Sequence, residues 1–201
     1  MKTEKKKVRY RGKGQSFERW VCRELSTWVS CGKVDSLFWR SSQSGGRATT
    51  LQKKGKRLAV HAGDIAAIEP GGARFISTFF VECKRKRSME LDKLFYRGRS
   101  GGLRGAWEKC QRQAESYGKV PMLIFKENAR AVMVVVPFGL GWTLPIGRIA
   151  TIYDLDVVVW SWEDFSFIVK PKQFIMEGER YASACHGRPA SNRPNRRRVS
   201  L

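Results

Sequence analysis

The stretch HAGDIAAIEPGGARFISTFFVECKRKR, residues 61–87, decides the fold of this chain. Two apolar runs flank the turn-forming sequence EPGG at residues 69–72, so the pattern predicts a β-hairpin. Side chains alternate between the two faces of a strand, so Phe80, Glu82 and Lys84 are expected to share one face of the second strand. Two opposite charges would therefore project together from a largely apolar strand.

The expected hairpin would place Asp64, in the first strand, beside Glu82 in the second. Two carboxylates suit Mg²⁺, because proteins usually bind this ion through one or two carboxylates, with water and phosphate oxygens as its other ligands. Lys84 is placed to orient or deprotonate an attacking water, or to stabilise charge on a phosphate. A surface ion pair between Glu82 and Lys84 is the alternative. His61 is expected to be a solvated or phosphate-contacting side chain.

A helix is predicted from about Phe17 to Cys31, with Ser16 as N-cap and Gly32 as its stop. Glu18 falls inside the arc of apolar residues that would be buried. A carboxylate in that position needs a cation, a metal or hydrogen-bond donors nearby, because burial removes its hydration.

Further elements follow from apolar patterning. Residues 40–50 have no apolar period and are expected to form a mobile basic loop. Trp160 and Trp162 are expected to lie in the core. The predicted elements are a strand at 35–40, a helix at 105–117, hairpin strands at 120–126 and 131–137, and a strand followed by a helix or strand at 154–169; residues 139–151 are left unassigned.

The composition indicates a basic protein with a polyanionic partner. The chain has 201 residues, 39 Lys and Arg against 18 Asp and Glu, and a net charge of +21. Such a charge favours binding to phosphate backbones. Five cysteines without a zinc-like spacing are expected to be reduced thiols in a cytoplasmic protein. The basic N-terminus lacks an apolar stretch after it, so we expect neither a signal peptide nor a membrane anchor.

The domain organisation expected is one compact domain with two arms. Residues 1–14 would be a basic flexible arm, 15–137 the core, 138–185 an extension of the same domain, and 186–201 a basic disordered tail.

The residues Gly63-Asp64 and Glu82-Cys83-Lys84 resemble the signature of the PD-(D/E)XK nucleases, an acidic residue opening one strand and E-x-K on the next. The proline of the signature is replaced by Gly63. The family often carries a Glu on its first helix, which Glu18 matches, and the stretch Gly14-x-x-Phe17-Glu18-Arg19 is similar to the start of archaeal Holliday-junction resolvases. The resemblance implies an α/β fold with a central mixed β-sheet flanked by helices, a restriction-endonuclease-like core.

The same resemblance implies further site residues. Mg²⁺, or Mn²⁺ in its place, would be held by Asp64, Glu82, the Cys83 backbone carbonyl and Glu18, and no small-molecule cofactor is expected. Archaeal Holliday-junction resolvases carry a Ser in a Gly-containing loop between the first helix and the acidic residue. Three serines occupy that place, and Ser44 is chosen. Many members present a Gln from a later helix; Gln111 is chosen, with Gln113 as the alternative.

The function implied is Mg-dependent cleavage of DNA, with branched DNA such as a Holliday junction as the expected substrate. Two symmetric cuts would call for a homodimer. One alternative is another structure-specific or restriction-like nuclease, such as one encoded by a phage, and another is a non-catalytic basic protein that binds nucleic acid. An RNA-binding protein of ribosomal type is disfavoured, because acidic residues are embedded in apolar segments.

Overall fold

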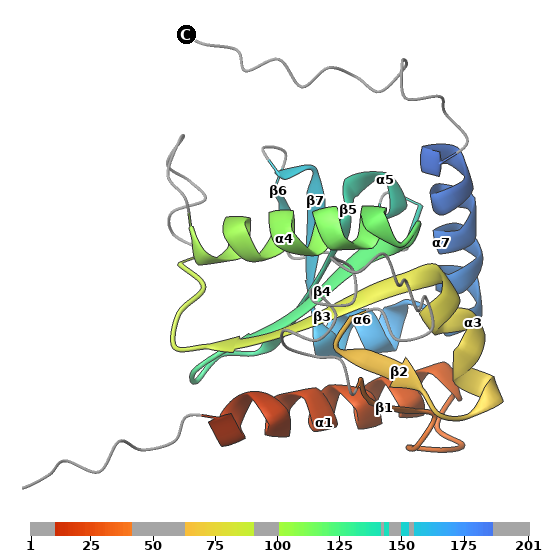
Figure 1. Cartoon of the computed structure of the whole chain (residues 1–201), viewed down its shortest axis with the longest axis horizontal. Coiled ribbons are helices and arrows are strands. Elements are labelled where there is room, and N and C mark those ends of the chain that lie inside the picture. Colours follow the sequence, from red (N-terminus) through yellow and green to blue (C-terminus); the bar gives the residue numbers. More distant parts are fainter. Residues whose placement is uncertain are drawn as a thin grey trace, which may run out of the picture.

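The computed structural model describes residues 11–41, 63–90, 101–141, 143–144, 150–152 and 155–186 (Figure 1). The helices are α1 (Arg11–Val29), α3 (Pro70–Thr78), α4 (Gly102–Ser116), α5 (Phe138–Gly141), α6 (Trp162–Ile168) and α7 (Pro171–His186). The strands are β1 (Phe38–Arg40), β2 (Ile65–Ala67), β3 (Phe79–Lys86), β4 (Val120–Glu127), β5 (Val132–Pro137), β6 (Ala150–Ile152) and β7 (Val157–Ser161).

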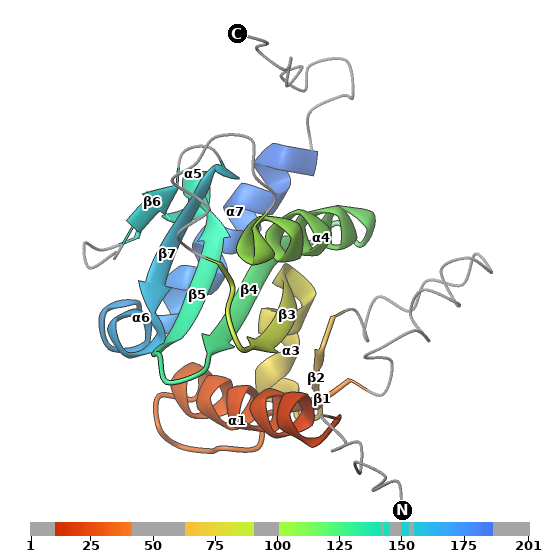
Figure 2. The same ribbon diagram turned by 90° about the vertical axis from the view of Figure 1, so that its left-hand side faces the viewer.

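The centre of the molecule is a mixed five-stranded sheet in the order β3-β4-β5-β7-β6. Strands β3 and β4 are parallel, and the other neighbours are antiparallel. A separate antiparallel ribbon, β1 with β2, lies beside β3 (Figure 2). The predicted α/β class with a central mixed sheet flanked by helices is therefore confirmed, as is the hairpin of β4 and β5.

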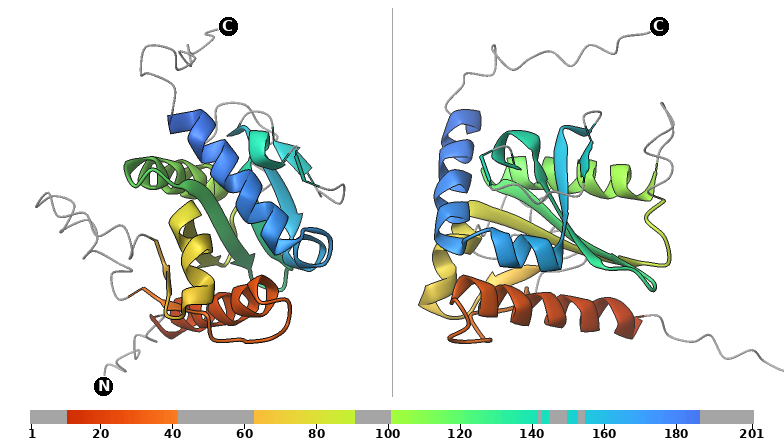
Figure 3. Two further views of the ribbon diagram at one scale, coloured as in Figure 1. Left: turned by 90° about the vertical axis from the view of Figure 1, so that its right-hand side faces the viewer. Right: turned by 180° about the vertical axis from the view of Figure 1, so that it is seen from behind.

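Helices cover both faces of the sheet. Residues of α1, α3, α6 and α7 form one buried cluster with Phe79, Val81 and Cys83 of β3 (Figure 3). Residues of α4 form the second cluster on the opposite face, with Phe80 of β3. The predicted alternation of β3 is thus confirmed, and Glu82, next in phase with Phe80, belongs to the α4 face.

The predicted hairpin at residues 69–72 is wrong, because Pro70 opens helix α3 instead. Proline suits the first helical position, where its missing N–H would have no partner. The glycines serve close packing and do not form the expected turn: a Cβ on Gly72 would come within 2.6 Å of the Phe38 ring. With Phe75 and Ile76 buried on the same helix, α3 seals the end of the core next to the ribbon.

Helix α1 begins at Arg11, earlier than the predicted start near Phe17, and ends at Val29. Gly32, at φ +82°, donates its N–H to the Thr27 carbonyl at 2.7 Å and supplies the predicted stop. Ser26 ties this helix to the ribbon, since its hydroxyl accepts the N–H of Phe38 at 3.1 Å. The helix and the ribbon therefore hold one another in place.

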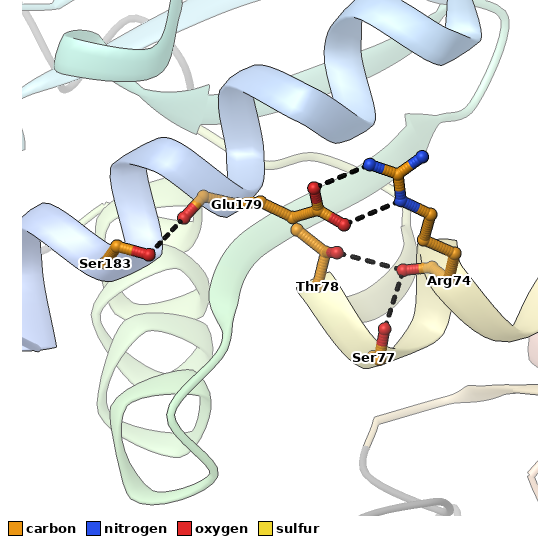
Figure 4. Close-up of polar contacts among 5 residues, drawn as sticks. All are labelled: Arg74, Ser77, Thr78, Glu179 and Ser183. Atoms are coloured by element: carbon orange, nitrogen blue, oxygen red, sulfur yellow. Dashed lines mark hydrogen bonds and ion pairs between the residues drawn. The ribbon is translucent and has the colours of Figure 1, made fainter.

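The segment after β5 completes the core. Strand β7 pairs with β5, and Trp160 and Trp162 are buried as predicted, although Trp162 opens α6 and is not part of the strand. Phe174 of α7 stacks on Phe79 with ring centroids 4.5 Å apart. Figure 4 shows the bidentate pair of Arg74 with Glu179, at 2.8 Å for each contact, joining α3 to α7. These residues fix the helices behind the strand that carries Glu82.

All five cysteines are free, with those at 22, 83 and 110 buried. Burial raises the pKa of the Cys83 and Cys110 thiols well above the usual value, because a thiolate there would be poorly solvated. These thiols are therefore packing residues.

Candidate active site

Asp64 is attached to the free edge of β3 by two hydrogen bonds. Its N–H donates to the Val81 carbonyl at 2.9 Å, and its Oδ2 accepts the N–H of Cys83 at 2.8 Å. Since Cys83 follows Glu82 directly, these bonds bring the two carboxylates together. The sequence predicted that Asp64 and Glu82 would be neighbours, and they are. The expected hairpin is not the cause, because hydrogen bonds from Asp64 to the edge of β3 bring the two residues together.

Gly63 makes this approach possible. Its φ is +94°, and a Cβ built on it would lie 2.6 Å from the Val81 carbonyl oxygen. Proline is confined to φ near −65°, so it could not adopt this conformation. The replacement of the signature proline by glycine therefore has a structural reason in this chain.

Glu82 is only 4% exposed and is surrounded by cations. Lys84, on the same face of β3, forms an ion pair with its Oε1. Lys109 of α4 approaches the same oxygen at 3.4 Å. The sequence analysis missed Lys109, although a cation at the edge of the apolar stripe of a neighbouring helix was a usable signal.

Glu18 faces the site from α1, where it forms an ion pair with Arg40 at 2.5 Å. Arg40 ends β1, so this pair fixes the helix against the ribbon. Glu18 also contributes to raising the pKa of Asp64, which places the Glu18 carboxylate within electrostatic reach of the site. Glu18 was expected to need a cation nearby because it lies on the buried face of its helix. That cation is Arg40, which was not predicted from the sequence.

Burial and the nearby Glu82 raise the pKa of Asp64 to about 7. The hydrogen bond from Cys83 N–H and the charge of Lys84 oppose this rise without cancelling it. For Lys84, burial is the largest single effect and lowers the pKa, but the charge of Glu82, the hydrogen bond to Glu82 and the charge of Asp64 together outweigh it, so the pKa is raised. Lys84 is therefore a charged ammonium near neutral pH, whereas burial disfavours the ionised form of Asp64.

The sequence matches the model of a family described as "Phage putative PDDEXK endonuclease" over residues 9–174. The chain belongs to this family. The match confirms the predicted PD-(D/E)XK superfamily and its α/β restriction-endonuclease-like fold. No curated protein and no solved structure matches the chain. Among the helices that the structure describes, none combines the length and apolarity required to cross a membrane.

The two candidate glutamines of this chain lie at opposite edges of α4. Lys109, which contacts Glu82, identifies the edge that faces the site, and Gln113 follows it by one helical turn. Gln113 also has a buried side-chain Oε1 without a hydrogen-bond partner among the described residues. Gln111 stays a prediction, and the geometry favours Gln113 in its place.

Ser44 and His61 lie outside the described residues. Of the three loop serines, Ser41 is described: it is buried, and its N–H donates to the Asp64 carbonyl at 2.9 Å. Ser41 thus lies opposite Asp64 at the end of the ribbon. This position makes Ser41 a second candidate for the serine that the resemblance to Holliday-junction resolvases implies.

The donor set fits a hard divalent cation. Within the part of the chain that the structure describes, no three His, Cys, Asp or Glu side chains form a metal-binding group, so a site here rests on two carboxylates and backbone. The N–H of Cys83 donates to Asp64 at the edge of β3. Because the N–H and C=O of a strand residue project to the same side, the Cys83 carbonyl faces this edge too. Two carboxylates, one carbonyl and water are oxygen ligands of the kind that Mg²⁺ takes.

Proposed function

We propose that this endonuclease is a metal-dependent DNA hydrolase that cuts phosphodiester bonds in branched DNA. The observation that carries the proposal is the junction of Asp64 with β3, which sets its carboxylate beside Glu82 and Lys84. Family membership supports the endonuclease activity, and the charge of +21 supports a polyanionic substrate.

Mg²⁺, with Mn²⁺ as a substitute, would be held by Asp64, Glu82 and the Cys83 carbonyl. When bound, the ion polarises the scissile phosphate and lowers the pKa of a bound water. The raised pKa of Asp64 supports such a site, because an added cation would relieve the repulsion between the carboxylates. Glu18 would join through water while its Oε2 stays paired with Arg40.

Lys84 would hold the attacking water and stabilise charge on the phosphate. Its ammonium is charged and already oriented by Glu82, so it can donate to a phosphate oxygen without reorganisation. The water oxygen bonds to phosphorus as the bond from phosphorus to the 3′ oxygen breaks. The 3′ oxygen takes up a proton, which leaves a 3′-hydroxyl and a 5′-phosphate.

Branched DNA is proposed as the substrate because the start of the first helix and the Ser/Gly loop resemble Holliday-junction resolvases. The stretch that carries the first likeness, Gly14 to Arg19, lies on α1, where Glu18 faces the site. Paired cuts on a symmetric junction would require a homodimer. The free thiols suit a reducing cytoplasm.

The test is incubation of the full chain with junction, flap and linear duplex DNA, in Mg²⁺ or in EDTA. We expect cleavage of the branched substrates in Mg²⁺, none in EDTA, and a loss of at least about 100-fold in Glu82→Gln and Lys84→Met. Lys172→Met is the matched control, since Lys172 is exposed on α7, outside the candidate site, and should leave the rate within a few fold. Cleavage in EDTA, or undiminished cleavage by Glu82→Gln, would overturn the proposal.

A further inference from the structure

An exposed tryptophan lies on the ribbon next to the candidate active site. Trp39 of β1 is 54% exposed, although its neighbour Phe38 is buried in the core. Ile68, directly after β2, is 56% exposed. A half-exposed Trp on a short strand leaves a large apolar surface in water, and the ribbon as a whole is held in place by α1 and α3.

Trp39 lies on the ribbon directly before Arg40 and two residues before Ser41, both of which contact residues of the candidate site. In the ribbon Trp39 pairs with Ala66 and shares its face, while Phe38 and Arg40 share the other face. The ladder continues at both ends, since Ser41 N–H donates to Asp64 and Ile68 N–H to the Leu37 carbonyl.

The chain runs from Trp39 through Arg40, which meets Glu18 on α1, to Ser41, whose N–H donates to the Asp64 carbonyl. The exposed indole therefore lies on the strand that leads to the carboxylate proposed to hold the metal.

The charge nearby fits nucleic acid. Arg85, Lys86 and Arg87 are exposed directly beyond Lys84, at the end of the strand whose edge carries Asp64. Cations of this kind contact phosphates, and an exposed indole offers its face to a base. An exposed aromatic surface and exposed cations, on the two elements that meet at Asp64, suit a nucleotide whose base is not paired.

We infer that Trp39 is a stacking platform for an unpaired base of the DNA substrate, next to the scissile phosphate. The inference rests on the proposed function and adds the feature by which a branch point would be distinguished from continuous duplex. Fully paired duplex keeps its bases stacked on one another, so Trp39 would gain little from it, whereas a base at a fork or branch is free to stack on the indole.

The test measures binding in EDTA, so that it is independent of cleavage. Full-length protein is titrated into a duplex and into the same duplex ending in a fork, with 2-aminopurine at the unpaired position next to the branch. We expect fork affinity to fall about 5- to 100-fold in Trp39→Ala, with duplex affinity within about twofold of the original. The 2-aminopurine fluorescence should be quenched by the original chain and by Trp39→Phe, but not by Trp39→Ala.

Phe167→Ala is the matched control, because Phe167 is 83% exposed on α6, which lies beside β7, whereas the ribbon lies beside β3 (Figure 2). It should change neither affinity nor fluorescence. Equal weakening of fork and duplex by Trp39→Ala, or unchanged quenching, would overturn the inference. Failure of the proposed function would look different: the original chain would then cut no DNA in Mg²⁺, whatever the binding data show.

Discussion

Replacing Asp64 by Asn tests the electrostatic description of the site, because it removes a charge while keeping an oxygen that can accept the Cys83 N–H. Burial and Glu82 raise the pKa of Asp64 from 3.8 to about 7 in the folded chain. One pKa unit corresponds to about 1.4 kcal/mol, so the ionised carboxylate costs the metal-free fold up to about 4 kcal/mol. This cost is absent below about pH 4, grows between pH 4 and 7, and is constant above pH 7.

Asp64→Asn should therefore stabilise the metal-free protein by about 2–4 kcal/mol at pH 8 and by about 1 kcal/mol or less near pH 4.5. Urea unfolding in EDTA at the two pH values measures this difference. Mg²⁺ should stabilise the original chain but not the variant. Asp35→Asn, at an exposed position, is the control and should change stability by less than about 0.5 kcal/mol. A variant that is no more stable than the original chain at pH 8 would refute the reasoning.

Four further substitutions probe the same site. Gly63→Ala should destabilise the fold by about 1–3 kcal/mol and reduce cleavage, because the added Cβ would lie 2.6 Å from the Val81 carbonyl oxygen at an unfavourable φ. Thermal unfolding measures the loss of stability, and an unchanged unfolding midpoint would contradict this expectation. Gln113→Ala should lower kcat about tenfold or more while Gln111→Ala leaves it within a few fold, and the reverse order would restore the sequence-based choice. Lys109→Met should weaken DNA binding or slow cleavage about 3- to 10-fold without loss of stability, since the Lys109 side chain is half exposed. A fall in the unfolding midpoint would instead show that the ion pair of Lys109 with Glu82 stabilises the fold.

The sequence predicted the strand that carries the chemistry better than the path of the chain toward it. Alternation alone placed Glu82 and Lys84 on one face of β3, because that period is a local property of extended backbone. Residues 69–72 misled the analysis, since Pro and Gly are common both in turns and at the start of a helix. What decided between the two was the packing of Gly72 on Phe38, a contact distant in sequence.

The partners of the acidic residues were also beyond sequence reasoning. Arg40 for Glu18 and Lys109 for Glu82 come from elements whose approach depends on how the helices pack on the sheet. The same limit applies to the two glutamines of α4. Helical spacing put them at opposite edges, and only the contact of Lys109 with Glu82 shows which edge faces the site.

The central claim is that Asp64 and Glu82 bind one divalent ion together. Crystals grown with Mn²⁺ test it most directly, because anomalous scattering locates that ion. The account predicts a peak at about 2.0–2.3 Å from a carboxylate oxygen of each residue and from the Cys83 carbonyl. A peak elsewhere, or none at an Mn²⁺ concentration that supports cleavage, would contradict it.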